Sequence, residues 1–321
     1  MPLFSQVHTD GPLANLSVAR PPQGFAANSA FPILNVAKKS DLYYIYDDEQ
    51  SFRRQSDDSV NPGSGTNQSD AAVTTGSYTT GGHGLHEVIS AEDLANADVP
   101  IALAADAVER LVQKLSVNKE VAAATSLNAS LTGSQTAAAN GGVSGWNNTT
   151  TGTPIADIIA GIEQIETAGG VRPNVMIMDS AVWHNLRHHP DISALVVSGQ
   201  DTTNNNPANI STQGVANLFG FDEVVVSRAV KNTAIMNQTP APSRVWSDDC
   251  YILHSPPSPG LKSFSCGKQF TWLGGGAASN GFRVRTWFDN KIESDVVEVK
   301  AYYDLKIVSA TAGYRISNCT N

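Results

Sequence analysis

The sequence predicts an α+β fold, and three observations lead to that prediction. Residues 99–127 have the spacing of one long amphipathic helix, with Leu103 and Leu111 on its apolar face. Residues 297–307 alternate apolar and polar side chains over eleven positions, which is the period of a β-strand. Residues 170–230 alternate short strands and helices. Together these patterns indicate either one large domain or two to three lobes.

Length and composition set the first limits. With 321 residues the chain can bury a full core without disulfides or metals. Its cysteines, Cys250, Cys266 and Cys319, form an odd set without a closely spaced pair, which favours reduced thiols in a cytoplasmic setting. The first residues lack the pattern of a signal peptide, and no stretch reaches the ~20 apolar residues of a membrane span. The net charge of −9 argues against a protein whose main task is to coat nucleic acid.

Residues 1–40 are rich in proline and glycine and lack helical periodicity. Such a segment cannot build a core of its own, so we expect an arm that is either disordered or ordered against a neighbour. Within it, residues 31–36 are apolar enough to dock on another surface.

Residues 41–89 predict a long two-stranded ribbon. Residues 41–46 are aromatic and prone to form a strand, and residues 76–80 and 85–89 are candidate return strands. The polar loop 53–70 between them contains an Asn-Pro-Gly turn. A two-stranded ribbon is marginally stable alone, so this one needs a partner surface.

The long helix follows Ser90, which begins a sequence typical of a capping box. At ~1.5 Å per residue the helix spans roughly 40 Å, which suggests a spine rather than a core helix. Residues 129–153 are dense in Gly, Asn and Thr and predict a loop around Trp146. The next helix covers residues 154–167, where Pro154 suits the first turn.

The central α/β unit begins with residues 174–179, a short apolar run that predicts a buried strand. Ser180 can cap the following helix over residues 181–189, and Pro190 stops that helix. Residues 197–209 then form a polar loop with one charged residue.

The unit closes with the helix 215–219, a left-handed stop at Gly220 and the β-branched strand 224–226. Beyond it, three further segments alternate enough to be strands before the long strand 297–307. These segments are residues 244–254, 261–273 and 282–289.

The sequence offers no catalytic or cofactor motif. It lacks a phosphate-binding loop, a nucleophile elbow and a dinucleotide-binding glycine pattern. His184 and His188 have the spacing of a zinc pair on a helix, but Asn185 stands where a metalloprotease would have Glu. We therefore expect no enzyme activity, no cofactor and no metal, and we interpret Trp183 and Trp272 as packing residues.

Taken together, the segments resemble the major capsid proteins of tailed bacteriophages with the Hong Kong 97-type fold, in particular the lambda-like group. The resemblance covers nearly the whole chain, and it rests on the order and spacing of many short motifs. These motifs are residues 31–36, 43–46, 61–65 and 95–100, Glu120, Trp146, residues 154–157, 172–174, Met178, residues 182–183, 186–188, 190–192, 218–226 and 229–230.

The resemblance implies an architecture for the α+β chain. It implies an N-terminal arm, an extended loop, a peripheral lobe with the spine helix and long strands, an axial lobe, and return strands through the edge of the axial lobe and the peripheral lobe. The corresponding residues are 1–40, 41–89, 90–150, 151–240 and 241–321.

The resemblance also implies the partners. The chain would assemble with itself into hexamers and pentamers of an icosahedral head, with the extended loop lying across the neighbouring subunit. Portal and scaffolding proteins, a possible decoration protein, and double-stranded DNA held without sequence-specific binding complete the expected partners. The head would form in the host cytoplasm, and no membrane takes part. Candidate contacts between subunits are Arg53, Arg54, Asn61, Asn204, Asn205 and Asn206.

Two departures from the family pattern lead to expectations. The prototype of the fold cross-links a Lys of its extended loop to a neighbouring Asn, but this sequence has no Lys between Lys39 and Lys114. We expect no such isopeptide bond. Some members carry a scaffolding segment before the arm, whereas about forty residues precede the ribbon here. We expect a separate scaffolding protein or none.

Three alternatives stay open. An encapsulin-type nanocompartment shares the fold but encloses enzymes, and the lambda-like motifs favour a virus over it. An ordinary α/β enzyme would need a catalytic motif that the sequence does not offer. A tail or decoration protein rich in strands is disfavoured by the long helix.

Overall fold

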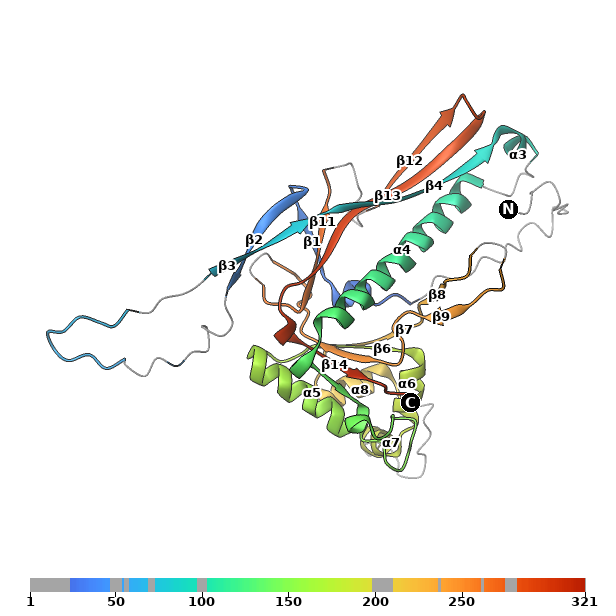
Figure 1. Ribbon diagram of the computed structural model, residues 1–321. Helices are drawn as coiled ribbons and strands as arrows, with labels where there is room; N and C mark the ends of the chain where they lie inside the picture. Colours follow the sequence, from blue (N-terminus) through green and yellow to red (C-terminus); the bar gives the residue numbers. More distant parts are fainter. Residues whose placement is uncertain are drawn as a thin grey trace.

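The computed structural model describes residues 24–46, 54, 58–68, 73–96, 103–197, 210–235, 238–260, 263–274 and 282–320. These residues form two five-stranded sheets and two two-stranded ribbons around helix α4 (Leu103–Ser130). Figure 1 shows α4 lying along the upper sheet and ending beside the lower one. The predicted spine helix is confirmed, and its 28 described residues span roughly 42 Å at ~1.5 Å each.

The first sheet is built around its longest strand, β13 (Ser294–Ile307). Strand β4 (Gly81–Ser90) pairs antiparallel with one side of β13 over ten residue pairs. The other side of β13 pairs first with β12 (Phe282–Asp289) and then with β11 (Gly267–Trp272). Strand β1 (Ile33–Val36) adds to β11 in parallel. Residues 31–36 therefore dock, as expected, and they do so as an edge strand.

The alternation along β13 places its apolar side chains on the face of the first sheet that α4 covers. Val297 and Val299 are buried in one cluster with Leu111 of α4, on the face predicted to be apolar. A salt bridge adds to this contact, because Arg110 of α4 lies 2.6 Å from the Glu87 carboxylate of β4. The spine helix thus packs along β4 and β13.

A separate ribbon extends from this sheet. Strands β2 (Ser40–Tyr46) and β3 (Val73–Thr79) pair antiparallel, and the ribbon projects to the left in Figure 1. We call residues 40–79 the flap. The prediction of one ribbon over residues 41–89 was wrong in one respect: β4 belongs to the first sheet, because it pairs with β13. A pairing between segments 200 residues apart leaves no local sequence signal.

The second sheet has the strand order β5-β14-β10-β6-β7. Strands β6 and β10 are fully buried, and β7 runs parallel to β6, as a strand–helix–strand unit requires. The strands are β5 (Thr136–Ala138), β14 (Gly313–Ser317), β10 (Cys250–Leu253), β6 (Val175–Asp179) and β7 (Glu223–Ser227).

Four helices cover one face of this sheet, and a large apolar core lies between them. Trp146, Leu186 and Phe219 are among the buried members of that core. Gly220 ends α8 in the left-handed conformation, with φ 74°, as predicted. The helices are α5 (Pro154–Gly169), α6 (Ser180–His188), α7 (Pro190–Val197) and α8 (Thr212–Phe219).

One local prediction for α6 was wrong. The cap of α6 is Asp179, whose side chain accepts a hydrogen bond from the Ala181 N–H, and Ser180 is the first helical residue. The prediction that the helix stops at Pro190 is confirmed, and Pro190 also begins α7, because proline is well suited to the first turn of a helix. Val197, the first residue of the predicted loop 197–209, is the last residue of α7, and the rest of that loop lies outside the described residues.

The other face of the second sheet packs against the C-terminal part of α4, which connects this sheet to the first one. Leu127 of α4 lies in one cluster with Ile177 of β6 and Tyr251 of β10. The short arm helix α1 (Ala27–Ala30) packs into the same cluster. Three smaller elements complete the fold: α3 (Ala91–Ala95), and the ribbon of β8 (Val230–Asn232) with β9 (Pro242–Arg244).

Candidate assembly surfaces

The stem of the flap exposes apolar side chains on its outward face. Alternation along β2 places Tyr43 inward, while Leu42 is 64% exposed and Tyr44 is 69% exposed. Val73 on the opposite strand is also exposed. Large apolar side chains on a projecting ribbon are typical of a contact surface rather than of free solvent surface.

The base of the flap is held rigidly on the first sheet. The Phe270 ring of β11 packs against both Tyr78 and Tyr43, with ring centroids 4.6 Å and 5.3 Å away. Burial raises the pKa of both tyrosines. The backbone N–H of Thr79 also donates to the Asp304 carboxylate at 2.9 Å. The direction of the flap is therefore set by packing and by a hydrogen bond to β13.

The predicted contact residues lie partly on the flap. Asn61 is exposed in the turn at its far end, where the Ser64 N–H donates to the Asn61 carbonyl at 3.0 Å. Arg54 is also exposed. Arg53 and the predicted contacts Asn204, Asn205 and Asn206 lie outside the described residues. Contact between subunits at these positions stays a prediction.

The arm is fixed to the spine helix by one buried carboxylate. Glu120 is 1% exposed, and it accepts hydrogen bonds from the Ala27 N–H and the Trp246 Nε1–H, both at 2.7 Å. Burial raises the pKa of Glu120, while these hydrogen bonds oppose that shift. A single side chain of α4 therefore joins the N-terminal end of α1 to the segment before β10. We call this junction the Glu120 clamp.

The neighbouring residue supports the same junction. Lys119 Nζ donates to the Asn28 side-chain oxygen at 2.6 Å. Burial lowers the pKa of Lys119 to about 8, because a charged ammonium loses hydration there. The two residues Lys119 and Glu120 thus hold consecutive residues of the arm.

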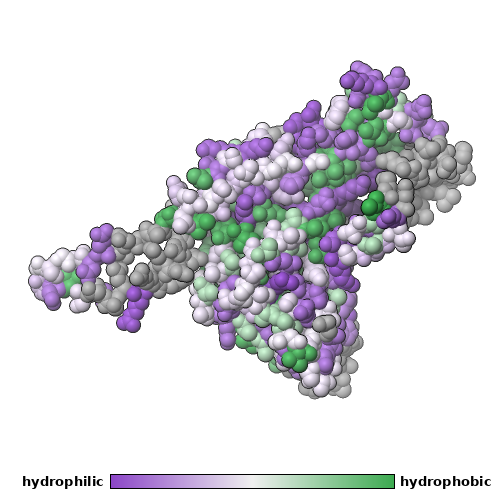
Figure 2. All heavy atoms as spheres, in the orientation of Figure 1, coloured by the Kyte–Doolittle hydropathy of each residue, from purple (hydrophilic) through white to green (hydrophobic). Residues whose placement is uncertain are grey.

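A second apolar surface lies near the end of the β12–β13 hairpin. Val284, Trp287, Phe288 and Ile292 are exposed there. Figure 2 shows apolar side chains gathered below the tip of this hairpin, at the upper right of the view. Arg285 lies over the Trp287 ring, 5.5 Å from its centroid. This end of the first sheet is therefore also suited to contact another molecule.

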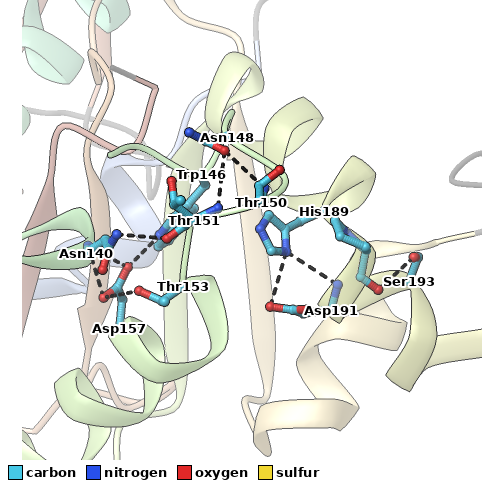
Figure 3. Close-up of polar contacts among 11 residues, drawn as sticks. Asn140, Trp146, Asn148, Thr150, Thr151, Thr153, Asp157, His189, Asp191 and Ser193 are labelled. Carbon is cyan, nitrogen blue, oxygen red and sulfur yellow. Dashed lines mark hydrogen bonds and ion pairs between the residues drawn. The ribbon is translucent and has the colours of Figure 1, made fainter. Parts of the chain in front are cut away.

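In the lower lobe, one carboxylate organises the loop before α5 (Figure 3). Asp157 accepts hydrogen bonds from the Asn140 N–H, from the Trp146 Nε1–H at 2.8 Å and from the Thr153 hydroxyl. Asn140 adopts φ 47°, a left-handed conformation that Asn tolerates well. We call these hydrogen bonds the Asp157 clamp. They hold the loop that carries Val143, which is 80% exposed.

His189 lies beside this loop and is buried (Figure 3). Its Nδ1 is 3.5 Å from the Asp191 carboxylate, and its backbone carbonyl accepts from the Ser193 N–H. These contacts join the end of α6 to the first turn of α7. We interpret His189 as a structural residue.

The described residues contain no cluster of three or more His, Cys, Asp or Glu side chains that could hold a metal. The spacing of His184 and His188 has a local explanation, because His188 Nδ1 lies 2.7 Å from the His184 carbonyl. All three cysteines are buried, and burial raises the pKa of the Cys266 thiol to about 12. A thiol with such a pKa is a poor nucleophile.

A cavity of about 660 Å³ lies between the arm and the second sheet. Its lining includes Asn28, Pro32, Asp222, Glu223 and Pro256. The lining combines prolines with two carboxylates and contains no His or Cys. The lining also includes Ser255, whose hydroxyl donates to the Ser29 carbonyl at 2.7 Å.

Sequence reasoning found the flap but missed the residues that fix it. Phe270 sits in a strand that was predicted, yet its role depends on Tyr43 and Tyr78 from a distant segment. Glu120 stood among the motifs of the resemblance, but nothing in the sequence connects it with Trp246. The sequence did offer one signal: Glu120 is an acidic residue on the apolar face of an amphipathic helix, and a buried carboxylate needs hydrogen-bond partners.

No helix among the described residues is long and apolar enough to cross a membrane. The model of the family described as phage capsid protein matches residues 59–316. No curated protein sequence is significantly similar to the chain.

Several solved structures are similar over almost the whole chain. A phage-related protein from Bordetella bronchiseptica RB50 is 18% identical, with 98% of both chains covered and a TM-score of 0.65. A chain of the capsid of cyanophage P-SCSP1u is 8% identical, with 97% of this chain and 92% of that chain covered and a TM-score of 0.64. A chain of a virus-like particle from Pyrococcus furiosus is 11% identical, with 90% and 91% covered and a TM-score of 0.51.

Proposed function

Because the chain belongs to the phage capsid protein family, we propose that its copies form the hexamers and pentamers of an icosahedral head around double-stranded DNA. The protein is a structural, major capsid protein, and its fold is the α+β fold of the Hong Kong 97 type. The copies associate with one another to build the shell of the virion.

The observation that carries the finer proposal is the flap. Its two strands project from the sheet, and Leu42 and Tyr44 face outward on them. A ribbon of two strands cannot cover these side chains itself. A neighbouring copy in a ring supplies the missing surface, and many such weak contacts give a stable closed shell.

The lobes can be assigned on the same basis. We place the extended loop at the flap, the peripheral lobe at the first sheet with α4, and the axial lobe at the second sheet with α5 to α8. The arm comprises residues 1–40, and the axial lobe residues 151–240. The peripheral lobe, proposed as residues 90–150, takes β4 in addition, because β4 pairs with β13. Residues 241–321 return through both lobes.

Electron microscopy of the purified protein tests the proposal. We expect closed shells with hexamers and pentamers, and nuclease-protected double-stranded DNA inside particles taken from infected cells. Tyr44→Ala should lower the yield of shells, while Lys39→Ala, a change at the exposed base of the flap, should not. Unassembled monomers under all conditions would contradict the proposal.

Further partners follow from the same role. A head that packages DNA needs a portal, and correct closure requires either a scaffolding protein or a chain that closes alone. A decoration protein could bind the exposed end of the β12–β13 hairpin. Assembly is proposed to take place in the host cytoplasm. Expression of this chain alone and with candidate partners separates these possibilities.

An encapsulin-like shell is the second candidate. We keep this candidate because the chain is similar to a virus-like particle from Pyrococcus furiosus. A shared fold does not determine what a shell encloses. Particles purified from the natural source decide between the two. Double-stranded DNA inside supports the phage head, and an enclosed protein without DNA supports the second candidate.

A further inference from the structure

Two of the three cysteines lie next to the same residue of the second sheet. Ile316 of β14 is directly opposite Cys250 of β10 in the antiparallel ladder. The chain then turns at Asn318, which adopts φ 57°, and the Cys319 Sγ lies 3.4 Å from the Ile316 carbonyl oxygen. Cys250 and Cys319 therefore approach Ile316 from two sides, one from the neighbouring strand and one from the turn after β14.

Both thiols belong to the same core. Cys250 and Cys319 are fully buried in the apolar cluster between the second sheet and its helices, together with Ile316. Directly opposite residues of an antiparallel ladder point to the same face of the sheet, so Cys250 and Ile316 share that face. The charge of one thiol also affects the other, because burial and the neighbouring Cys250 raise the pKa of the Cys319 thiol. The two sulfur atoms thus lie within range of each other.

The backbone of Cys319 connects two parts of the lower lobe. Its N–H donates to the Asp248 carbonyl, and its carbonyl accepts from the Trp146 N–H, both at 2.8 Å. Cys319 therefore joins the segment before β10 to the loop that the Asp157 clamp holds. A segment that follows the last strand of a sheet opens locally at a lower free-energy cost than the strands themselves.

The third cysteine has a different environment. Cys266 is buried in the cluster on the other face of the second sheet, together with Leu127 and Leu253. The sheet itself separates this thiol from the other two. Cys266 is therefore an internal comparison, since it is equally buried but has no place in the same pair.

We propose that Cys250 and Cys319 form a disulfide bond when the protein meets an oxidising medium, and that this bond fixes the segment after β14 to β10. The chain is made with free thiols in the reducing cytoplasm, and the bond forms after release of the particle. The release step rests on the proposed function. The pairing of the two cysteines does not.

The oxidant in this proposal is a small disulfide such as oxidised glutathione. When residues 318–320 open, the Cys319 thiolate attacks one sulfur of the oxidant, and one glutathione thiolate leaves. As the segment closes, the Cys250 thiolate attacks the Cys319 sulfur and expels the second glutathione. The protein loses two electrons and two protons, and the oxidant becomes two thiols.

The surroundings of the pair make this reaction slow. Burial raises the pKa of the Cys250 thiol and of the Cys319 thiol, so the closed state supplies little thiolate. Local opening of residues 318–320 therefore sets the rate. Brief exposure to an oxidant leaves the pair reduced, whereas long residence in an oxidising medium completes the bond.

Oxidation of the purified, unassembled subunit tests the pairing. The folded protein is incubated with oxidised glutathione at mildly alkaline pH, free thiols are blocked, and a digest without reductant is read by mass spectrometry. We expect one internal bond, between the peptides of Cys250 and Cys319, in a chain that is lighter by two hydrogen atoms. Cys319→Ser should abolish this bond. Cys266→Ser, the matched control, should form it at the wild-type rate.

The effect on stability tests the second part of the proposal. The bond closes a loop of roughly 70 residues and should raise the melting temperature by roughly 5 °C. It should also slow hydrogen exchange of the Trp146 amide roughly tenfold, because that N–H donates to the Cys319 carbonyl. A reductant should reverse both changes, and Cys319→Ser treated with the same oxidant should show neither.

Particles from infected cells test the timing. We expect free thiols in particles taken before lysis and the bond between Cys250 and Cys319 in particles kept in an oxidising medium after release. Released particles that keep free thiols overturn the proposed timing.

The remaining outcomes separate this inference from the proposed function. A bond that includes Cys266, or glutathione adducts without an internal bond, overturn the pairing. An oxidised chain that melts and exchanges like the reduced one overturns the fixing of the segment. Each of these results leaves the proposed shell in place. A subunit that forms the bond but never assembles overturns the proposed function alone.

Discussion

The ring of Tyr78 in the flap lies parallel to the ring of Phe270 in β11, with 4.6 Å between centroids and 5° between planes. Tyr43 of the other flap strand contacts the same Phe270 ring from a tilted position. Both strands of the flap therefore rest on one aromatic side chain of the first sheet. Stacked aromatic pairs of this kind add to the stability that burial alone provides.

The first prediction compares two tyrosines of the flap. Tyr78 is 5% exposed and Tyr44 is 69% exposed. Tyr78→Ala should lower the free energy of unfolding by about 3 kcal/mol, because a buried aromatic ring is lost. Tyr44→Ala should change it by less than about 0.5 kcal/mol. Urea unfolding of the unassembled subunit measures both, and equal losses would contradict the proposed packing.

The second prediction concerns the Glu120 clamp. Glu120→Gln places an amide between two donors, the Ala27 N–H and the Trp246 Nε1–H, but offers them a single oxygen. We expect a loss of about 1–3 kcal/mol in the free energy of unfolding. Glu109→Gln, at an exposed position of the same helix, is the control and should be nearly neutral. A neutral Glu120→Gln would show that the clamp does not hold the arm.

The third prediction is a pH dependence at Lys119. Its pKa is about 8 in the folded protein and 10.5 ordinarily. Between these values the unfolded chain binds the proton that the folded chain has released, so this residue makes stability rise with pH across that window. Lys119→Met should remove that rise. Urea unfolding of both proteins at several pH values between 7.5 and 10.5 measures it, and parallel profiles would refute the assignment.

The fourth prediction concerns the clamp on the loop before α5. Asp157→Asn keeps one neutral acceptor oxygen, so it cannot accept both from Asn140 and Trp146, which donate to Oδ2, and from the Thr153 hydroxyl, which donates to Oδ1. We expect a loss of about 1–3 kcal/mol and a red-shifted Trp146 emission as the indole gains contact with water. Glu163→Gln, exposed on the same helix, should alter neither. An unchanged spectrum for Asp157→Asn would argue against the clamp.

The fifth prediction follows from the lysine positions. The flap contains no lysine, since none lies between Lys39 and Lys114. Assembled shells boiled in detergent should therefore run as single chains on a gel. A ladder of covalent multimers would falsify the expectation that the flap forms no isopeptide bond.

Patterns of short period were sufficient to predict the main elements. The alternation around Val297 and Val299 predicted β13, and the stripe through Leu103 and Leu111 predicted α4. Each of these elements is long enough for the spacing of its apolar side chains to show whether it is a helix or a strand. The αL stop at Gly220 was predictable for a similar reason, because glycine tolerates that conformation without strain.

Long-range relationships could not be predicted in this way. The pairing of β4 with β13 and the meeting of Glu120 with Trp246 join segments more than a hundred residues apart. Pro190 correctly predicted the end of α6, but the helix α7 that begins at the same proline was missed, because proline also suits the first turn of a helix. The candidate contact residues depend on a second copy of the chain, and a single sequence does not describe that copy.

The junction of the flap with the sheet has a mechanical consequence. Strand β3 continues into β4 after Thr80, and β4 is paired with β13 over ten residue pairs. A neighbour that pulls on the flap pulls β4 along its own length. That load acts on the whole ladder in shear, and the ladder yields only when all its bonds slip together. In the proposed head, a pull on the flap would therefore load the β4–β13 ladder in shear rather than peel it open pair by pair.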